Sequence, residues 1–333
     1  MTVHTLEAPP LEIKKWIEDW GSSSSEMLID LSCEIFTEEG TSGMVGYRLV
    51  ADYAVSFGDP VCPKEDWERL ITAFHQFCNY KQLRVIYLCT SQEFAVWAKQ
   101  RFCKIAIEVG SEYSFNPCSL TCLEGHKGYR LRNRIRHAEK RGVKCVEYFG
   151  GDSEREASMN EVAKEWLKAR QGPQIHLGPL QFFEERKGRR WFYLEWEGKT
   201  IGVAMLCALN KHEGWLLKFL MVTPTAPRGA SEALLISIFN ILAKENCRYV
   251  TYGTVAAETI DFVEGLGPVA IFALKKIYAL ISKTFQLEKK RMYWQKFRPH
   301  SESLYLLFSH SNIGWKEVRA LMKSIKIDWF PRL

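Results

Sequence analysis

The chain has 333 residues, of which 47% are hydrophobic and 25% are charged. This balance is typical of a folded globular protein and excludes a fibrous or largely disordered chain. Because one hydrophobic core rarely needs so long a chain, we expect two domains of roughly 150 residues each. The formal net charge of +6 is modest, so the positions of the charges are more informative than their sum.

The ten cysteines are scattered along the chain, and no pair has Cys-x-x-Cys spacing. Cys118 and Cys122 lack a second Cys or His pair at zinc-finger distance, so we expect no metal site. Reduced thiols are typical of a cytoplasmic protein. Residues 1–10 contain Glu7 and lack the apolar run of a signal peptide, which predicts the same location.

Strand and helix patterns alternate over the first 115 residues. The expected elements are paired strands at 44–57, an amphipathic helix at 64–80, a buried strand at 83–89, a helix at 93–101 and a strand at 105–115 with a bend at Gly110. Residues 127–144 then hold eight Lys or Arg against one acid, Glu139, which predicts a basic helix. The alternative, a solvated helix face without a partner, stays open.

The second half shows a β-β-β-α-β pattern. A strand at 143–148 and a helix at 153–171 come first; Asp152 or Ser153 caps this helix, and Gly172 and Pro173 stop it. Strands at 191–197, 200–209 and 214–222 predict an antiparallel meander, followed by a helix at 230–246 and a strand at 249–254. A second basic cluster at 283–298 holds six Lys or Arg and is interleaved with aromatic residues, a composition that suits polyanions.

The segment VTPTAPRGASEALL at 222–235 opens the helix after the meander. It resembles the coenzyme A pyrophosphate loop of GNAT acetyltransferases, where backbone N–H groups at a helix N-terminus hold the phosphates. Arg228, Gly229 and Ala233 fit that loop, whereas Ser231 stands where a glycine is usual. An ordinary glycine-containing helix start is the open alternative.

Further segments follow one another in the order of a single known family. They are FGDPVC at 57–62, FHQFC at 74–78, IYLCTS at 86–91, EVGSEYSF at 108–115, LRNRIRHAEKRG at 131–142, EWLKAR at 165–170, TPTAPRG at 223–229, YGT at 252–254 and KFRPHSESLY at 296–305. Over nearly its whole length the sequence resembles the C-terminal catalytic domain of the phosphatidylglycerol lysyltransferases and alanyltransferases, the multiple peptide resistance factor family, here in a free-standing form.

The resemblance implies an α/β (α+β) fold of two tandem GNAT-like domains, each a mixed, mostly antiparallel sheet flanked by helices. We expect an N-terminal domain at 1–125, a basic connection at 126–146 and a C-terminal domain with a basic extension at 147–333. The implied reaction moves an amino acid from aminoacyl-tRNA to a hydroxyl of a phosphatidylglycerol-like lipid, without a cofactor. The identity of the amino acid and of the acceptor depends on pocket shape rather than on linear pattern.

The resemblance also points to site residues. Where the family usually has Asp and Arg in the strand before the A-P-x-G turn, this chain has Lys218 and Met221, which indicates a changed substrate or a lost activity. The expected catalytic residues are Lys296, Lys218 and Tyr252. The expected substrate-binding residues are Arg228, Gly229, Tyr305 and Met221. The expected tRNA-binding residues are Arg130, Arg132, Arg134, Arg136, Lys140 and Arg141, because a tRNA end needs a cationic track.

Two other functions stay open from the sequence. One is an acyl-CoA-dependent N-acyltransferase, which would use acetyl-CoA; the other is a non-catalytic module that binds tRNA or a membrane. Residues 266–285 are apolar but contain three lysines, too polar for a spanning helix and compatible with docking at the inner face of the membrane.

Overall fold

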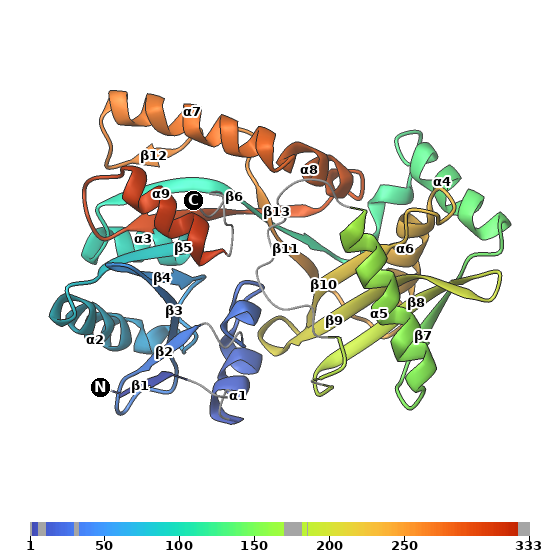
Figure 1. Cartoon of the computed structure of the whole chain (residues 1–333), viewed down its shortest axis with the longest axis horizontal. Coiled ribbons are helices and arrows are strands. Elements are labelled where there is room, and N and C mark those ends of the chain that lie inside the picture. Colours follow the sequence, from blue (N-terminus) through green and yellow to red (C-terminus); the bar gives the residue numbers. More distant parts are fainter. Residues whose placement is uncertain (1, 6–10, 30–32, 170–181, 185, 326–333) are drawn as a thin grey trace.

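A single open sheet organises the chain (Figure 1). The computed structural model describes residues 2–5, 11–29, 33–169, 182–184 and 186–325. Within this part, thirteen strands join in the order β1-β2-β3-β4-β5-β13-β6-β11-β10-β9-β8-β7, and β12 adds to β6. The strands are β1 (Thr2–Thr5), β2 (Glu34–Thr37), β3 (Val45–Val50), β4 (Tyr53–Phe57), β5 (Arg84–Ser91), β6 (Ile105–Phe115), β7 (Lys144–Tyr148), β8 (Arg189–Trp196), β9 (Lys199–Leu209), β10 (Gly214–Val222), β11 (Val250–Ala256), β12 (Val263–Glu264) and β13 (His300–Phe308).

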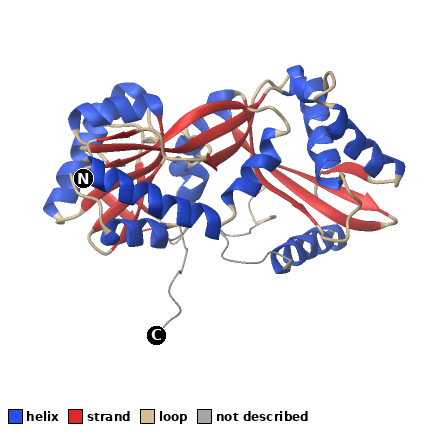
Figure 2. Cartoon of the chain, turned by 90° about the horizontal axis from the view of Figure 1, so that it is seen from above, coloured by secondary structure: helices blue, strands red, loops and turns tan. Residues whose placement is uncertain are grey.

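Helices cover both faces of this sheet (Figure 2). They are α1 (Leu11–Trp20), α2 (Trp67–Tyr80), α3 (Gln92–Arg101), α4 (Tyr129–Lys140), α5 (Ser153–Lys168), α6 (Ala230–Lys244), α7 (Pro268–Thr284), α8 (Leu287–Gln295) and α9 (Trp315–Ser324). In the second half, α4, α6 and α8 contribute to one hydrophobic core, and α5 to another. In the first half, α2 and α3 share one core, and α1, α7 and α9 pack against a second.

The same β-β-β-α-β unit occurs twice. Strands β2, β3 and β4 form an antiparallel meander, and α2 crosses over to place β5 parallel to β4. Strands β8, β9 and β10 repeat the meander, and α6 crosses over to place β11 parallel to β10. All other neighbouring strand pairs are antiparallel. The repeat confirms the expected tandem GNAT-like fold.

Strand β13 pairs with strands that lie far from it in the sequence. It pairs with β5 on one side and with β6 on the other, so the C-terminal part of the chain completes the first half of the sheet. The sheet also runs unbroken from one half to the other. The division into domains at residues 125 and 147 therefore stays a prediction.

The element boundaries follow local sequence signals. The side chain of Asp152 caps α5 by accepting from the N–H of Arg155 at 2.9 Å, as predicted. This helix ends at Lys168, and the predicted stop at Gly172 and Pro173 lies outside the described residues. The bend predicted at Gly110 is a bulge: Leu304 pairs with Gly110 and Tyr305 with Glu108, which leaves one extra residue in β6.

Candidate functional site

The sheet opens between β10 and β11. These parallel strands pair only through Trp215 and Leu216 of β10. Further along, each strand has a bulge, at Lys218 in β10 and at Tyr252 in β11. Beyond the bulges β10 pairs only with β9, and β11 only with β6. Helix α6 follows β10 in the chain and begins at the TPTAPRG turn, which was predicted as a binding loop.

The N-terminus of α6 is closed by the chain itself. Gly229 caps the helix with a φ of +93°, and a side chain there would collide with the carbonyl of Arg134 in α4. The first turn of a helix attracts negative charge, and here the buried carboxylate of Glu232 supplies it. Arg228 is exposed beside this turn. The turn therefore differs from an open phosphate loop.

Glu232 joins α4, α6 and the end of α8. Its Oε1 accepts from Lys296 Nζ at 2.7 Å and from Arg134 Nη1 at 2.9 Å, and its Oε2 accepts from the Ser231 hydroxyl at 2.9 Å. The Lys296 ammonium also lies 3.7 Å from the ring centroid of Tyr293. We call Lys296, Glu232 and Arg134 the junction cluster. It carries two cations and one anion.

In the junction cluster the anion is buried, whereas the two cations reach solvent. The Glu232 side chain is 5% exposed, whereas Lys296 is 23% and Arg134 43% exposed. Burial by itself would raise the pKa of Glu232, but the charge of Lys296 and the hydrogen bonds from Lys296, Arg134 and Ser231 lower this pKa to about 2. Burial lowers the pKa of Lys296, and Glu232 opposes that shift. At neutral pH the cluster is an ion pair whose cations still reach solvent, so it can donate to an anionic oxygen.

Tyr252 lies beside the junction cluster. Its ring lies against Trp294 of α8, with centroids 3.8 Å apart and the ring planes tilted by 31°, and the Lys290 ammonium lies 5.2 Å from the Tyr252 ring centroid. A polar hollow of about 330 Å³ is lined by residues of α8 and of the paired strands β6 and β11. Its lining includes Glu108, Ser111, Tyr113, Glu258, Thr259, Asp261, Arg291 and Gln295, the residue before Lys296.

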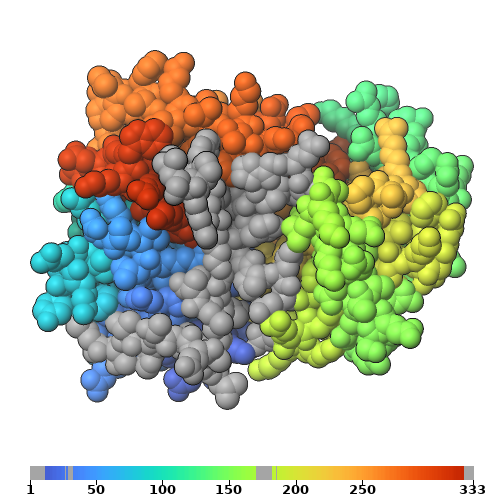
Figure 3. All heavy atoms as spheres, viewed as in Figure 1, coloured from blue at the N-terminus to red at the C-terminus, as the bar shows by residue number. Residues whose placement is uncertain are grey.

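Helix α4 presents a cationic face next to α6. Its buried residues are Leu131, Ile135 and Ala138, spaced for one helix face. The opposite side and the following turn expose four of the predicted tRNA-binding residues, which form no ion pair with a described residue. These are Arg130, Arg136, Lys140 and Arg141. We call them the α4 cationic face. In Figure 3 the segment around α4 (green) lies beside α6 (yellow) at one end of the molecule.

The two remaining arginines of α4 bind the chain itself. Arg132 donates to the carbonyls of Leu123 and Gly125, and Arg134 belongs to the junction cluster. These contacts attach both guanidinium groups to the chain, although the Arg134 side chain remains 43% exposed.

Three predicted site residues pack or pair with groups outside the junction cluster among the described residues. Lys218 binds Glu26, a residue of the 3₁₀ turn Ser25–Ile29, at 3.1 Å, and Arg189 binds the same carboxylate at 2.9 Å. Met221 is 2% exposed in the core against α5, and Tyr305 is 9% exposed in the core of the first half. The structure thus brings together Lys296, Tyr252, Gly229 and Arg134, whereas Lys218, Met221 and Tyr305 make their contacts with other groups.

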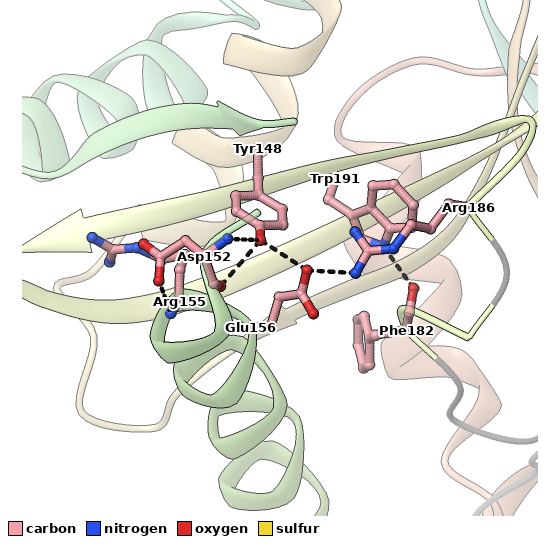
Figure 4. Close-up of polar contacts among 7 residues, drawn as sticks. All are labelled: Tyr148, Asp152, Arg155, Glu156, Phe182, Arg186 and Trp191. Atoms are coloured by element: carbon pink, nitrogen blue, oxygen red, sulfur yellow. Dashed lines mark hydrogen bonds and ion pairs between the residues drawn. The ribbon is translucent and has the colours of Figure 1, made fainter. Parts of the chain in front are cut away.

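A second hollow, of about 490 Å³, lies on the strand β7 and β8 side of the second half. Its arginines are all paired: Arg190 binds Glu147 and Glu245, and Arg189 binds Glu26. Figure 4 shows the neighbouring network, in which the Glu156 carboxylate accepts from the Tyr148 hydroxyl at 2.8 Å and from Arg186 at 2.7 Å. Because carboxylates already neutralise these arginines, this hollow is a weaker candidate for binding an anion than the α4 cationic face.

Glu232 and Glu26 are not among the site residues predicted from the sequence. The one sequence signal for Glu232 is its place as an acid in the first turn of α6. Glu26 has no local signal, because its partner Lys218 lies 192 residues away in the sequence. Among the described residues, no three His, Cys, Asp or Glu side chains are grouped so as to hold a metal ion.

The repeated β-β-β-α-β unit and the opening between β10 and β11 define a tandem GNAT-like fold. Residues 18–308 match the family model for the C-terminal region of phosphatidylglycerol lysyltransferase, so the chain belongs to that family.

Solved structures agree on the fold. L-PGS from Bacillus licheniformis is 18% identical with a TM-score of 0.75, covering 96% of each chain. The C-terminal domain of a putative lysylphosphatidylglycerol synthetase from Agrobacterium fabrum is 17% identical with a TM-score of 0.74, covering 93% of this chain and 94% of that one. A Bacteroides thetaiotaomicron protein of unknown function is 12% identical with a TM-score of 0.56, covering 91% and 93%. No curated protein matches the chain.

Proposed function

We propose that this protein transfers an amino acid from aminoacyl-tRNA to a hydroxyl group of a phosphatidylglycerol-like lipid. The observation that carries the proposal is the continuity between the α4 cationic face and the junction cluster. Arg134 belongs to α4 and binds Glu232, which in turn binds Lys296. A polyanion lying on α4 would therefore end beside an ammonium group.

The cationic face suits the donor. Arg130, Arg136 and Lys140 lie on the exposed side of one helix and can neutralise successive phosphates. Such contacts position a nucleic acid without reading its bases. This matches a donor that must be recognised by its terminal ester.

Lys296 suits the chemistry. The acceptor hydroxyl oxygen forms a bond to the ester carbonyl carbon, the bond from that carbon to the ribose oxygen breaks, and the acceptor proton passes to the leaving ribose oxygen. Negative charge develops on the carbonyl oxygen in between, and a fixed ammonium stabilises it. Glu232 and the Tyr293 ring hold the Lys296 ammonium in place. The carboxylates of the hollow next to α8 suit the ammonium group of the amino acid.

The acyl-CoA alternative has less support. A pyrophosphate at the start of α6 would meet the carboxylate of Glu232, and the backbone of α4 occupies the space in front of Gly229. The geometry therefore favours tRNA as the donor.

Two variants separate chemistry from donor binding. Lys296→Met is expected to lower the rate of label transfer from aminoacyl-tRNA to phosphatidylglycerol by about 10²- to 10³-fold, the usual cost of losing one oxyanion donor. The triple variant Arg130→Glu, Arg136→Glu, Lys140→Glu is expected to weaken tRNA binding and to reduce the slope of log K against log salt by about 2 to 3.

The matched control is Lys81→Glu, Lys168→Glu, Lys199→Glu, which makes the same change of net charge at exposed positions outside α4. Equal tRNA affinity of the two triple variants would contradict the donor proposal. Wild-type transfer rates in Lys296→Met would contradict the role of Lys296.

A further inference from the structure

Helix α7 has an unusual surface. It has 17 residues, none of them buried, although it packs along the edge of the molecule (Figure 1). Its inner side is fixed by Leu274 and Tyr278, which pack against the core of the first half; the Tyr278 hydroxyl donates to the carbonyl of Ala257 at 2.6 Å. In the described residues, no helix has the length and apolar character needed to cross a bilayer.

The outer side of α7 is apolar and basic. Val269 is 84%, Phe272 65% and Leu280 57% exposed, and Lys276 and Lys283 lie on the same side at helical spacing. The Lys276 ammonium lies over the Phe272 ring at 5.4 Å. Three large exposed apolar side chains on one helix face are more than a scatter of single exposed residues.

The charge of this region matches an anionic partner. Residues 268–296 carry seven Lys or Arg and one acid, so this segment alone accounts for the net charge of +6 of the whole chain. Helix α7 itself has three lysines and no acid. Apolar side chains with lysines at their edge are the pattern of a helix that lies in the membrane interface, where lysine stems cover apolar surface and the ammonium reaches the headgroups.

We propose that the outer side of α7 docks on the surface of an anionic bilayer, with Val269, Phe272 and Leu280 inserted among the headgroups and Lys275, Lys276 and Lys283 paired with lipid phosphates. The inference builds on the proposed function, because it brings the lipid acceptor to the same part of the molecule. Two residues separate α7 from α8, and Lys296 directly follows the last residue of α8. In Figure 3 the α7 atoms (orange) form one rim of the molecule.

Vesicle flotation tests the docking without tRNA. Wild-type protein is expected to float with vesicles of phosphatidylcholine containing 40% phosphatidylglycerol and not with pure phosphatidylcholine. The variant Lys275→Gln, Lys276→Gln, Lys283→Gln is expected to bind roughly a hundredfold more weakly, since each lysine near an anionic surface contributes about fivefold. Phe272→Ser, Leu280→Ser is expected to weaken binding by about tenfold or more.

The controls remove the same groups elsewhere. Lys81→Gln, Lys168→Gln, Lys199→Gln has the same net charge as the lysine variant, and Tyr80→Ser, Phe149→Ser removes two aromatic rings that are 83% and 88% exposed. Both controls are expected to bind like the wild type. Equal binding to the two vesicle types, or unchanged binding of either α7 variant, would overturn the proposal.

The outcome is separable from that of the proposed function. Loss of docking in the α7 variants, with no transfer by any form, would leave the docking surface established and the transfer reaction refuted. Transfer to a detergent-dispersed acceptor by the α7 variants, with reduced transfer to vesicles, would support both.

Discussion

Replacing Glu232 with Gln tests whether the junction cluster is an ion pair. The carboxylate is 5% exposed, and its pKa is lowered from 4.5 to about 2. A shift of this size corresponds to about 3 kcal/mol of the free energy of unfolding at pH 7. Because the folded-state pKa lies below the unfolded one, this stabilisation is complete above pH 4.5 and is lost as the pH falls toward 2. At pH 3 about 1.5 kcal/mol of it remains.

Urea unfolding followed by tryptophan fluorescence measures the effect. Glu232→Gln is expected to lower the free energy of unfolding by about 3 kcal/mol at pH 7 and by about half as much at pH 3. Glu154→Gln is the matched control, since Glu154 is also an acid in a first helical turn but is exposed. A loss below 1 kcal/mol at pH 7, or one that does not change with pH, would refute the assignment.

Three further predictions concern other parts of the structure. Glu26→Gln removes the buried carboxylate that Lys218 and Arg189 share, and it is expected to lower the free energy of unfolding in urea by roughly 3 kcal/mol at pH 7. Lys218→Met should leave the transfer rate per folded molecule within twofold. Burial lowers the pKa of His75 to about 4, so between pH 6.5 and 4 this side chain is protonated in the unfolded chain but not in the folded one. The free energy of unfolding should therefore fall by about 3 kcal/mol as the pH drops from 7 to 4. His75→Gln should remove this part of the pH dependence. Gly229→Ala places a methyl group against the carbonyl of Arg134, at a residue whose φ is +93°. It should lower the melting temperature by several degrees, since each kcal/mol of lost stability lowers it by about 2 °C or more. An unchanged melting temperature would contradict the close packing of α4 on α6.

Local sequence patterns predicted most of the elements. The meander β8-β9-β10 and the helix α6 follow from strand periodicity, turn residues and a glycine at the helix start, all of which act within a few residues. The place of β13 between β5 and β6 was missed, because pairing over about 200 residues leaves no local trace.

The candidate site was only partly predictable for the same reason. Motif similarity pointed to Lys296 and Gly229. Gly229 caps α6, and Lys296 binds Glu232 in the first turn of the same helix. It also pointed to Lys218, which binds Glu26 instead. Composition marked α4 as basic, yet only contacts between helices distinguish Arg134, which binds Glu232, from Arg130, which is exposed.

The proposed function is the transfer of an amino acid from aminoacyl-tRNA to a lipid hydroxyl by this protein. The most direct test incubates the purified protein with total tRNA charged with labelled amino acids and with a total lipid extract, and measures label in the organic phase. We expect enzyme-dependent transfer, which also identifies the amino acid, and a rate at least a hundredfold lower in Lys296→Met. Tight tRNA binding without any label in the organic phase would contradict the proposed function.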